Sequence, residues 1–127
     1  MTAILAAFLI VHGLLHVAIW LPHFDADTAK PPPFRPDHSG VLIAVHAPEQ
    51  AALWLAIMLA LTAAWLFVSA GGFVALSMTG AATLVEAAAV LGIALKALFF
   101  HPWLTIGMLL DACVLLIAVT GWPLTLA

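Results

Sequence analysis

The sequence predicts an all-α fold, an integral membrane four-helix bundle that forms a single domain over residues 1–127. The chain is 66% hydrophobic and 7% charged, which is too apolar for a soluble globular protein. It contains four apolar runs, each long enough to cross a hydrocarbon core about 30 Å thick at about 1.5 Å of helix rise per residue. A net charge of -3 without a basic segment argues against nucleic acid as a partner.

The first predicted span covers residues 2–21, contains no Lys, Arg, Asp or Glu, and is ended by Pro22. It lacks a positively charged start and a cleavage site in a polar context, so we expect it to be retained rather than removed as a signal peptide. His12 and His16 lie near its middle, four residues apart, and therefore point from one helix face. Unpaired imidazoles at this depth are costly, so this face should contact other helices rather than lipid.

A proline-rich loop over residues 22–50 connects the first two spans and carries most of the charged residues. Its three consecutive prolines favour an extended course along the membrane surface. Residues 40–46 are apolar but too short to span, which indicates an interfacial helix or a strand-like segment. Pro48 and Glu49 are typical of a helix start, because proline suits the first turn and a carboxylate suits the positive helix end.

The remaining spans are predicted at residues 51–69, 73–100 and 103–120, with a tight turn at residues 70–72. The third span is longer than a crossing requires, so we expect it to be tilted or bent, with Gly80 as the bend. Pro102 separates it from the fourth span. This topology places tryptophans at both membrane faces, as in an interfacial belt: Trp20, Trp54 and Trp103 on the first-loop side, and Trp65 and Trp122 opposite.

The basic residues Lys30, Arg35 and Lys96 all fall on the first-loop side of this topology. The positive-inside tendency then makes that side cytoplasmic and places both termini outside. The single cysteine, Cys113, excludes an intrachain disulfide, and it lies on the face of its helix opposite Asp111.

Five ionisable residues lie within the predicted spans, namely His12, His16, Glu86, Lys96 and Asp111, and all of them except Lys96 form the candidate site. Counted from the first-loop face, helical rise places His16 and Lys96 roughly 8–9 Å deep, His12 and Asp111 roughly 15 Å deep, and Glu86 roughly 20–22 Å deep. Interface and entry candidates follow at the first-loop face: His23, His46, Lys96 and His101. Lys96 is expected to extend its ammonium group to that interface.

Four interpretations of this set remain open. The residues can hydrogen-bond to one another and fix the bundle, or they can relay protons, because imidazoles and carboxylates at graded depths suit a relay. His12 and His16 with Asp111 and Glu86 can instead bind a transition metal. The intervening Gly13-Leu14-Leu15 lacks the glutamate of a zinc protease motif. Haem b would need axial histidines on opposite faces, such as His12 or His16 with His46 or His101.

The His-Gly-Leu-Leu-His motif of residues 12–16, four spans, and a last span opening with Thr-Ile-Gly-Met at residues 105–108 form a recognisable combination. It resembles a group of small four-span bacterial membrane proteins of uncharacterised function that carry His-Gly-Leu-(Ile or Leu)-His in their first helix. The resemblance covers the first helix and, loosely, the fourth. It implies the bacterial inner (cell) membrane and singles out His12 and His16, and it implies no chemistry.

The preferred functional hypothesis is a small membrane protein that binds or relays a cation, with a proton favoured over a transition metal, within an oligomer or a larger complex. Small residues on its helices would suit partner helices. One alternative is a non-catalytic accessory subunit of a membrane complex. A second is a metal- or haem-dependent membrane oxidoreductase, although the residues favour a protein that is not an enzyme and require no cofactor.

Overall fold

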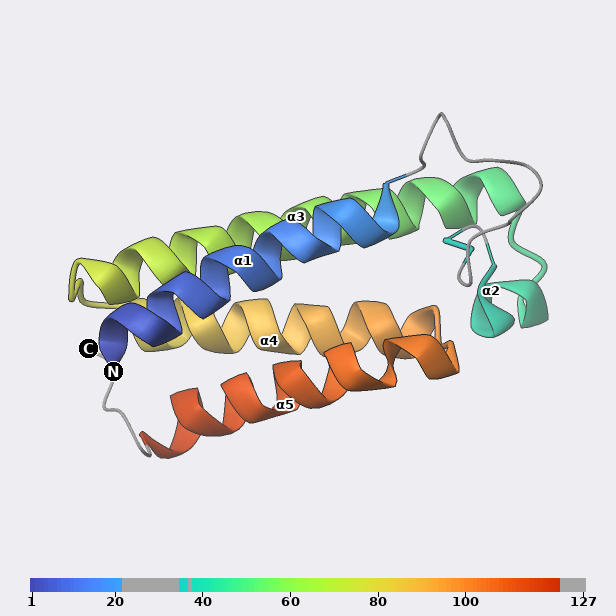
Figure 1. The fold of residues 1–127 in the computed structure, drawn as a ribbon. Helices are drawn as coiled ribbons and strands as arrows, with labels where there is room; N and C mark the ends of the chain where they lie inside the picture. Colours follow the sequence, from blue (N-terminus) through green and yellow to red (C-terminus); the bar gives the residue numbers. More distant parts are fainter. Residues whose placement is uncertain (22–34, 37, 122–127) are drawn as a thin grey trace.

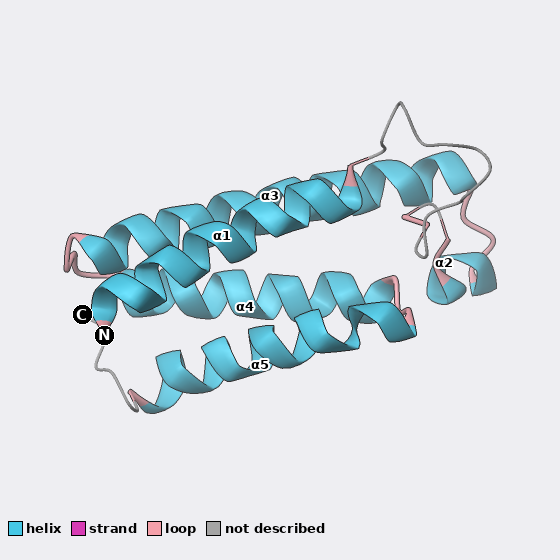
Figure 2. Ribbon diagram, in the orientation of Figure 1, coloured by secondary structure: helices cyan, strands magenta, loops and turns pink. Residues whose placement is uncertain are grey.

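A computed structural model describes residues 1–21, 35–36 and 38–121 (Figure 1). The described chain is helical and contains no strand (Figure 2). In order, the elements are α1 (Thr2–Trp20), α2 (Gly40–Ala44), α3 (Glu49–Ala75), α4 (Ala81–Leu98), η1 (Pro102–Leu104) and α5 (Thr105–Thr120). Four helices are long and apolar enough to cross a membrane: α1, α3, α4, and η1 with α5. The predicted all-α bundle of four apolar helices is therefore confirmed.

The four long helices pack in chain order, α1 on α3, α3 on α4 and α4 on α5 (Figure 1). Small residues make the α1–α3 contact close. A Cβ atom built on Gly13 would lie 2.9 Å from the Ala64 carbonyl oxygen and from the Phe67 Cβ. The α3 face turned into the bundle is mostly alanine, as expected for helices that associate in a membrane without a hydrophobic driving force between them.

The turn between the second and third spans was predicted in the wrong place. Residues 70–72 continue α3, which ends only at Ala75. Gly71 packs directly against α1, where a Cβ would approach Ile10 Cγ1 to 2.6 Å, so this glycine serves helix contact rather than a turn. The chain reverses over residues 76–80, where Ser77 (φ 52°) and Gly80 (φ 88°) are left-handed. Gly80 is thus the N-cap of α4 and not a bend inside a helix.

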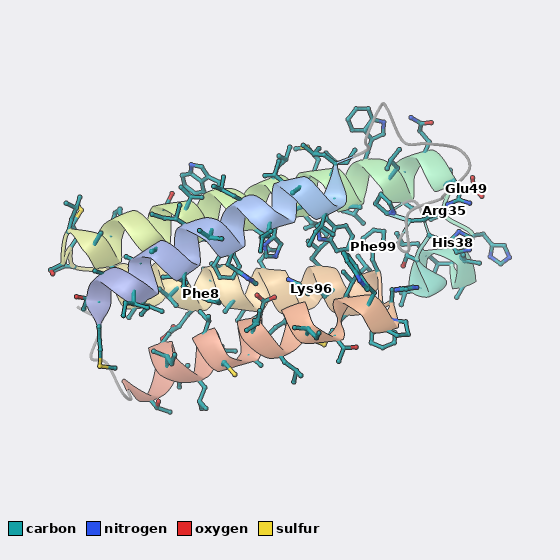
Figure 3. All side chains as sticks on the ribbon, viewed as in Figure 1. Phe8, Arg35, His38, Glu49, Lys96 and Phe99 are labelled. Atoms are coloured by element: carbon teal, nitrogen blue, oxygen red, sulfur yellow. The ribbon has the colours of Figure 1, made fainter. Side chains whose placement is uncertain are left out.

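The short helix α2 confirms the helical alternative for residues 40–46 and lies at the end of the bundle where α3 begins (Figure 1). Buried Ser39 attaches it: the hydroxyl donates to the Leu98 carbonyl at 2.5 Å and accepts from the Leu42 amide at 3.3 Å. One side chain therefore caps the start of α2 and the end of α4. Arg35, His38 and Glu49 lie near α2, so polar groups gather at this end (Figure 3).

Two apolar clusters fill the bundle, one toward each end. The cluster at the start of α1 includes Leu9, Phe67, Val85 and Val114. The second cluster lies toward α2 and consists of Trp20, Ala52, Ala56, Ala60, Leu95, Phe99 and Leu104. Trp20 was predicted to face the headgroup region, but it is buried and meets the Phe99 ring edge-on at 5.5 Å between centroids. Trp54, Trp65 and Trp103 are exposed, while Trp122 lies outside the described residues.

Candidate functional site

A cluster of four polar side chains separates the two apolar clusters, and we call it the polar cluster: His12, His16, Lys96 and Asp111. The buried face of α1 repeats every three or four residues, and this period turns both histidines inward. Asp111 comes from the buried face of α5 and Lys96 from that of α4. Three of the four long helices thus contribute to one site at mid-bundle.

The carboxylate of Asp111 is the centre of the polar cluster. His12 Nε2 lies 2.6 Å from Asp111 Oδ1, and Lys96 Nζ lies 2.6 Å from Asp111 Oδ2. Lys96 Nζ also lies 2.8 Å from His16 Nε2. A continuous hydrogen-bonded chain therefore runs from His16 through Lys96 and Asp111 to His12.

The partners of each ring assign the tautomers of the two histidines. His16 Nδ1 lies 3.0 Å from the carbonyl oxygen of His12 and must donate to it, since a carbonyl only accepts. His16 Nε2 is then the acceptor for Lys96 in the neutral ring. His12 instead donates from Nε2 to the carboxylate. The two imidazoles thus carry their protons on different nitrogens and have different roles in the chain.

Lys96 does not extend to the interface as the sequence analysis predicted. The residue is 4% exposed, and Figure 3 shows it inside the bundle between α1 and α5. Its ammonium pairs with a carboxylate that is fully buried, and this pairing offsets the cost of holding either charge away from water. With neutral imidazoles, the polar cluster has one positive and one negative charge and no net charge.

Two glycines make room for the ion pair. A Cβ on Gly92 of α4 would lie 2.5 Å from Asp111 Oδ2. A Cβ on Gly107 of α5 would lie 2.8 Å from Lys96 Cε. Each charged side chain thus lies against a glycine on the opposite helix, and this lets α4 and α5 approach while both side chains remain inside.

The ring of Phe67 supports both imidazoles from α3. It meets His12 edge-on with 4.8 Å between centroids and stacks on His16 with 5.3 Å between centroids. Phe8 stacks on His12 at 5.4 Å. These contacts fix the ring planes, and all buried side-chain nitrogen and oxygen atoms of the described residues have hydrogen-bond partners. Each buried polar atom of the cluster therefore has at least one hydrogen-bond partner, and the rings are held in one geometry.

A cleft of about 500 Å³ opens beside the polar cluster, with walls from α1 on one side and η1 and α5 on the other. His12, His16 and Lys96 form its polar floor. The walls are apolar, with Leu15 and Ile19 facing Ile106 and Leu110, and Trp103 lines it as well. Asp111 is not among the lining residues, so the cleft meets only the basic members of the polar cluster.

The other predicted site residues lie elsewhere. Glu86 is half-buried and lies in the second turn of α4, which begins at Ala81. Asp111 contacts α4 at Gly92, six residues further along the helix, or about 9 Å away along its axis. One group of possible metal-ligand atoms, all within 4.8 Å of one another, comes from His12, His16 and Asp111, and Glu86 does not belong to it.

The entry candidates at the first-loop side are not part of the polar cluster either, apart from Lys96. His46 is exposed in the connection between α2 and α3. His101 is half-buried before η1, where its Nδ1 accepts from the Trp103 amide at 3.2 Å. Neither belongs to the group of possible metal-ligand atoms that His12, His16 and Asp111 form. His23 lies outside the described residues.

No family model, curated protein or solved structure matches the chain. The fold and the polar cluster therefore have to be interpreted from their own residues and geometry.

Lys96 is the member of the polar cluster whose position the sequence analysis missed. A signal for it exists in the spacing of small residues. Gly92 precedes Lys96 by four positions and Gly107 precedes Asp111 by four positions, so each charge shares a helix face with a glycine. In a membrane helix, a small residue on the face of a charge indicates a close neighbouring helix and hence a buried charge.

Proposed function

We propose that this chain is a small membrane protein that takes up and releases a proton at the polar cluster, in exchange with the cleft between α1 and α5. The observation that carries the proposal is the hydrogen-bonded chain from His16 through Lys96 and Asp111 to His12. Every member is a group that binds or releases a proton, and ionisable residues inside a membrane are usually functional. We therefore favour a proton over a metal ion as the cation that this site binds.

The two apolar clusters lie at the two ends of the bundle, so they favour proton exchange through the lateral cleft over proton transport across the membrane. Leu9, Phe67 and Val114 separate the polar cluster from the end of the bundle where α1 begins. Trp20 and Phe99 pack at the other end. The lateral cleft, which three basic side chains line, is the route by which a proton donor or acceptor reaches the polar cluster.

Nitrogen NMR of the histidine rings in lipid nanodiscs tests the proposal. The signals of His12 and His16 should change together when the pH is varied over the range in which the protein stays folded, and Asp111→Asn should uncouple them. His46→Gln removes an exposed imidazole and is the matched control, which should leave both signals unchanged. Cluster signals that stay constant throughout this range would leave only a structural role for the hydrogen bonds.

Transition-metal binding is the second candidate, because the ligand atoms of His12, His16 and Asp111 lie within 4.8 Å of one another. The ammonium of Lys96, however, uses the lone pair of His16 Nε2 and one carboxylate oxygen. A metal ion would have to displace this positive charge. Elemental analysis of protein incubated with Zn²⁺ decides between the candidates: one bound equivalent that disappears in His12→Ala favours the metal, and no bound metal favours the proton.

A further inference from the structure

The cleft between α1 and α5 has the dimensions of a ligand site, and the proton exchange proposed above does not account for its size. Its volume of about 500 Å³ falls within the range of roughly 300–1,000 Å³ that is usual for small-molecule sites. Predominantly apolar walls with a few converging polar groups are the other common property of such sites.

The walls indicate where the ligand comes from. Ile106 is 72% exposed and Leu15 is 48% exposed, and both line the cleft on helices long enough to cross a membrane. In a bilayer these side chains contact lipid tails, so the cleft opens sideways into the hydrocarbon region. A ligand that enters there must itself be lipid-soluble.

The floor indicates the chemistry of the head group. An ammonium has three donors; Lys96 uses two at 2.6 Å and 2.8 Å, while its contact with the Gly92 carbonyl is 3.5 Å long. The third donor of Lys96, a residue that lines the cleft, is therefore only weakly engaged and suits a hydrogen-bond acceptor. Because the ion pair leaves the polar cluster without net charge in apolar surroundings, a neutral acceptor fits better than an anion.

We infer that the cleft binds a lipid-soluble quinone, with one ring carbonyl accepting a hydrogen bond from Lys96. A quinone is a neutral acceptor on an apolar tail, and its flat ring suits a cleft lined by the Trp103 indole. The inference rests on the proposed function in that the ligand would meet the same proton-binding groups. Binding can nevertheless be measured without any proton exchange.

The test titrates decyl-ubiquinone into the full chain in phosphatidylcholine nanodiscs, with empty nanodiscs subtracted and bound quinone determined after gel filtration. Leu15→Trp fills the cleft, whereas Leu14→Trp adds the same ring at a neighbouring exposed position that does not line it. Saturable binding near one quinone per chain is expected, weakened about tenfold or more by Leu15→Trp and unchanged by Leu14→Trp. Lys96→Met should weaken it as well.

Decanoate, with a similar tail and an anionic head, is titrated in parallel. Saturable decanoate binding that displaces the quinone would overturn the inference in favour of a fatty acid. Absence of saturable quinone binding, or equal binding by the two tryptophan variants, would overturn it too. Because the coupled change of His12 and His16 is measured separately without quinone, failure of quinone binding is distinguishable from failure of proton exchange.

Discussion

At the residue scale, the ion pair between Lys96 and Asp111 determines how the polar cluster behaves. Asp111 has no exposure and Lys96 has little, so either charge alone would be held in apolar surroundings without a counterion. Removing one member of a buried pair is far more costly than removing both, because the remaining charge keeps its desolvation penalty. The two side chains should therefore be coupled in stability.

This coupling predicts the stabilities of Lys96→Met and of the double variant that also carries Asp111→Asn. Lys96→Met should destabilise the protein by about 3–5 kcal/mol, because Asp111 stays buried without its ammonium partner. Adding Asp111→Asn removes the remaining charge while an amide oxygen can still accept from His12. Thermal unfolding in detergent should show that the double variant regains most of the stability that Lys96→Met loses. A double variant whose loss equals the sum of the two single losses would contradict the coupling.

A second prediction at this scale concerns the histidine tautomers. Nitrogen NMR at neutral pH should show the ring proton of His16 on Nδ1 and that of His12 on Nε2, because their acceptors are the His12 carbonyl and the Asp111 carboxylate. His12→Gln and His16→Gln assign the signals. The same tautomer at both positions would be incompatible with the hydrogen-bonded chain.

The extent to which this site is predictable from the sequence differs between its residues. His12, His16 and Asp111 follow from helical period and depth, because a polar residue in an apolar span has to face the bundle. Lys96 does not follow in this way, since a long flexible side chain near a helix end can reach the interface or turn inward. The choice depends on Gly107 and Asp111 across the bundle, and helix pairing is not encoded in local periodicity.

At the element scale, the four spans were predictable from apolar length, and the position of one turn was not. Glycines at residues 71 and 72 have the composition of a turn, yet Gly71 is required inside α3 for contact with α1. Leu76 and Met78 are apolar enough to resemble part of a span, although the reversal occurs over these residues. Glycine in membrane helices therefore has two uses, and only the neighbouring helix distinguishes them.

The neighbouring glycines of α3 provide a matched test of this interpretation. Gly71→Ala should destabilise the protein by about 1–3 kcal/mol, because the new Cβ would lie 2.8 Å from the Ala6 carbonyl oxygen. Gly72→Ala meets nothing within 4 Å and should be neutral or stabilising by up to about 1 kcal/mol, since alanine favours a helix. Thermal unfolding of both variants measures the difference, and equal effects would indicate that α1 does not pack closely there.

At the scale of the whole molecule, four spans place α2 and the start of α3 at one membrane face and the connection between α3 and α4 at the other (Figure 1). Because Lys96 is buried, it no longer counts toward the orientation, and Lys30 and Arg35 remain as the basic residues of the first loop. The positive-inside tendency still predicts a cytoplasmic first loop.

Cysteine labelling tests both the topology and the orientation. In a Cys113→Ala background, exposed Val45 and Leu76 are replaced singly by cysteine at opposite ends of α3. A membrane-impermeant maleimide added to intact cells should label Leu76→Cys but not Val45→Cys, and inside-out vesicles should reverse the pattern, because α3 crosses the bilayer between the two positions. The opposite pattern in cells would invert the orientation and leave the fold intact. Labelling of both positions from the same side would mean that α3 does not span the membrane, and the lipid-facing cleft would lose its basis.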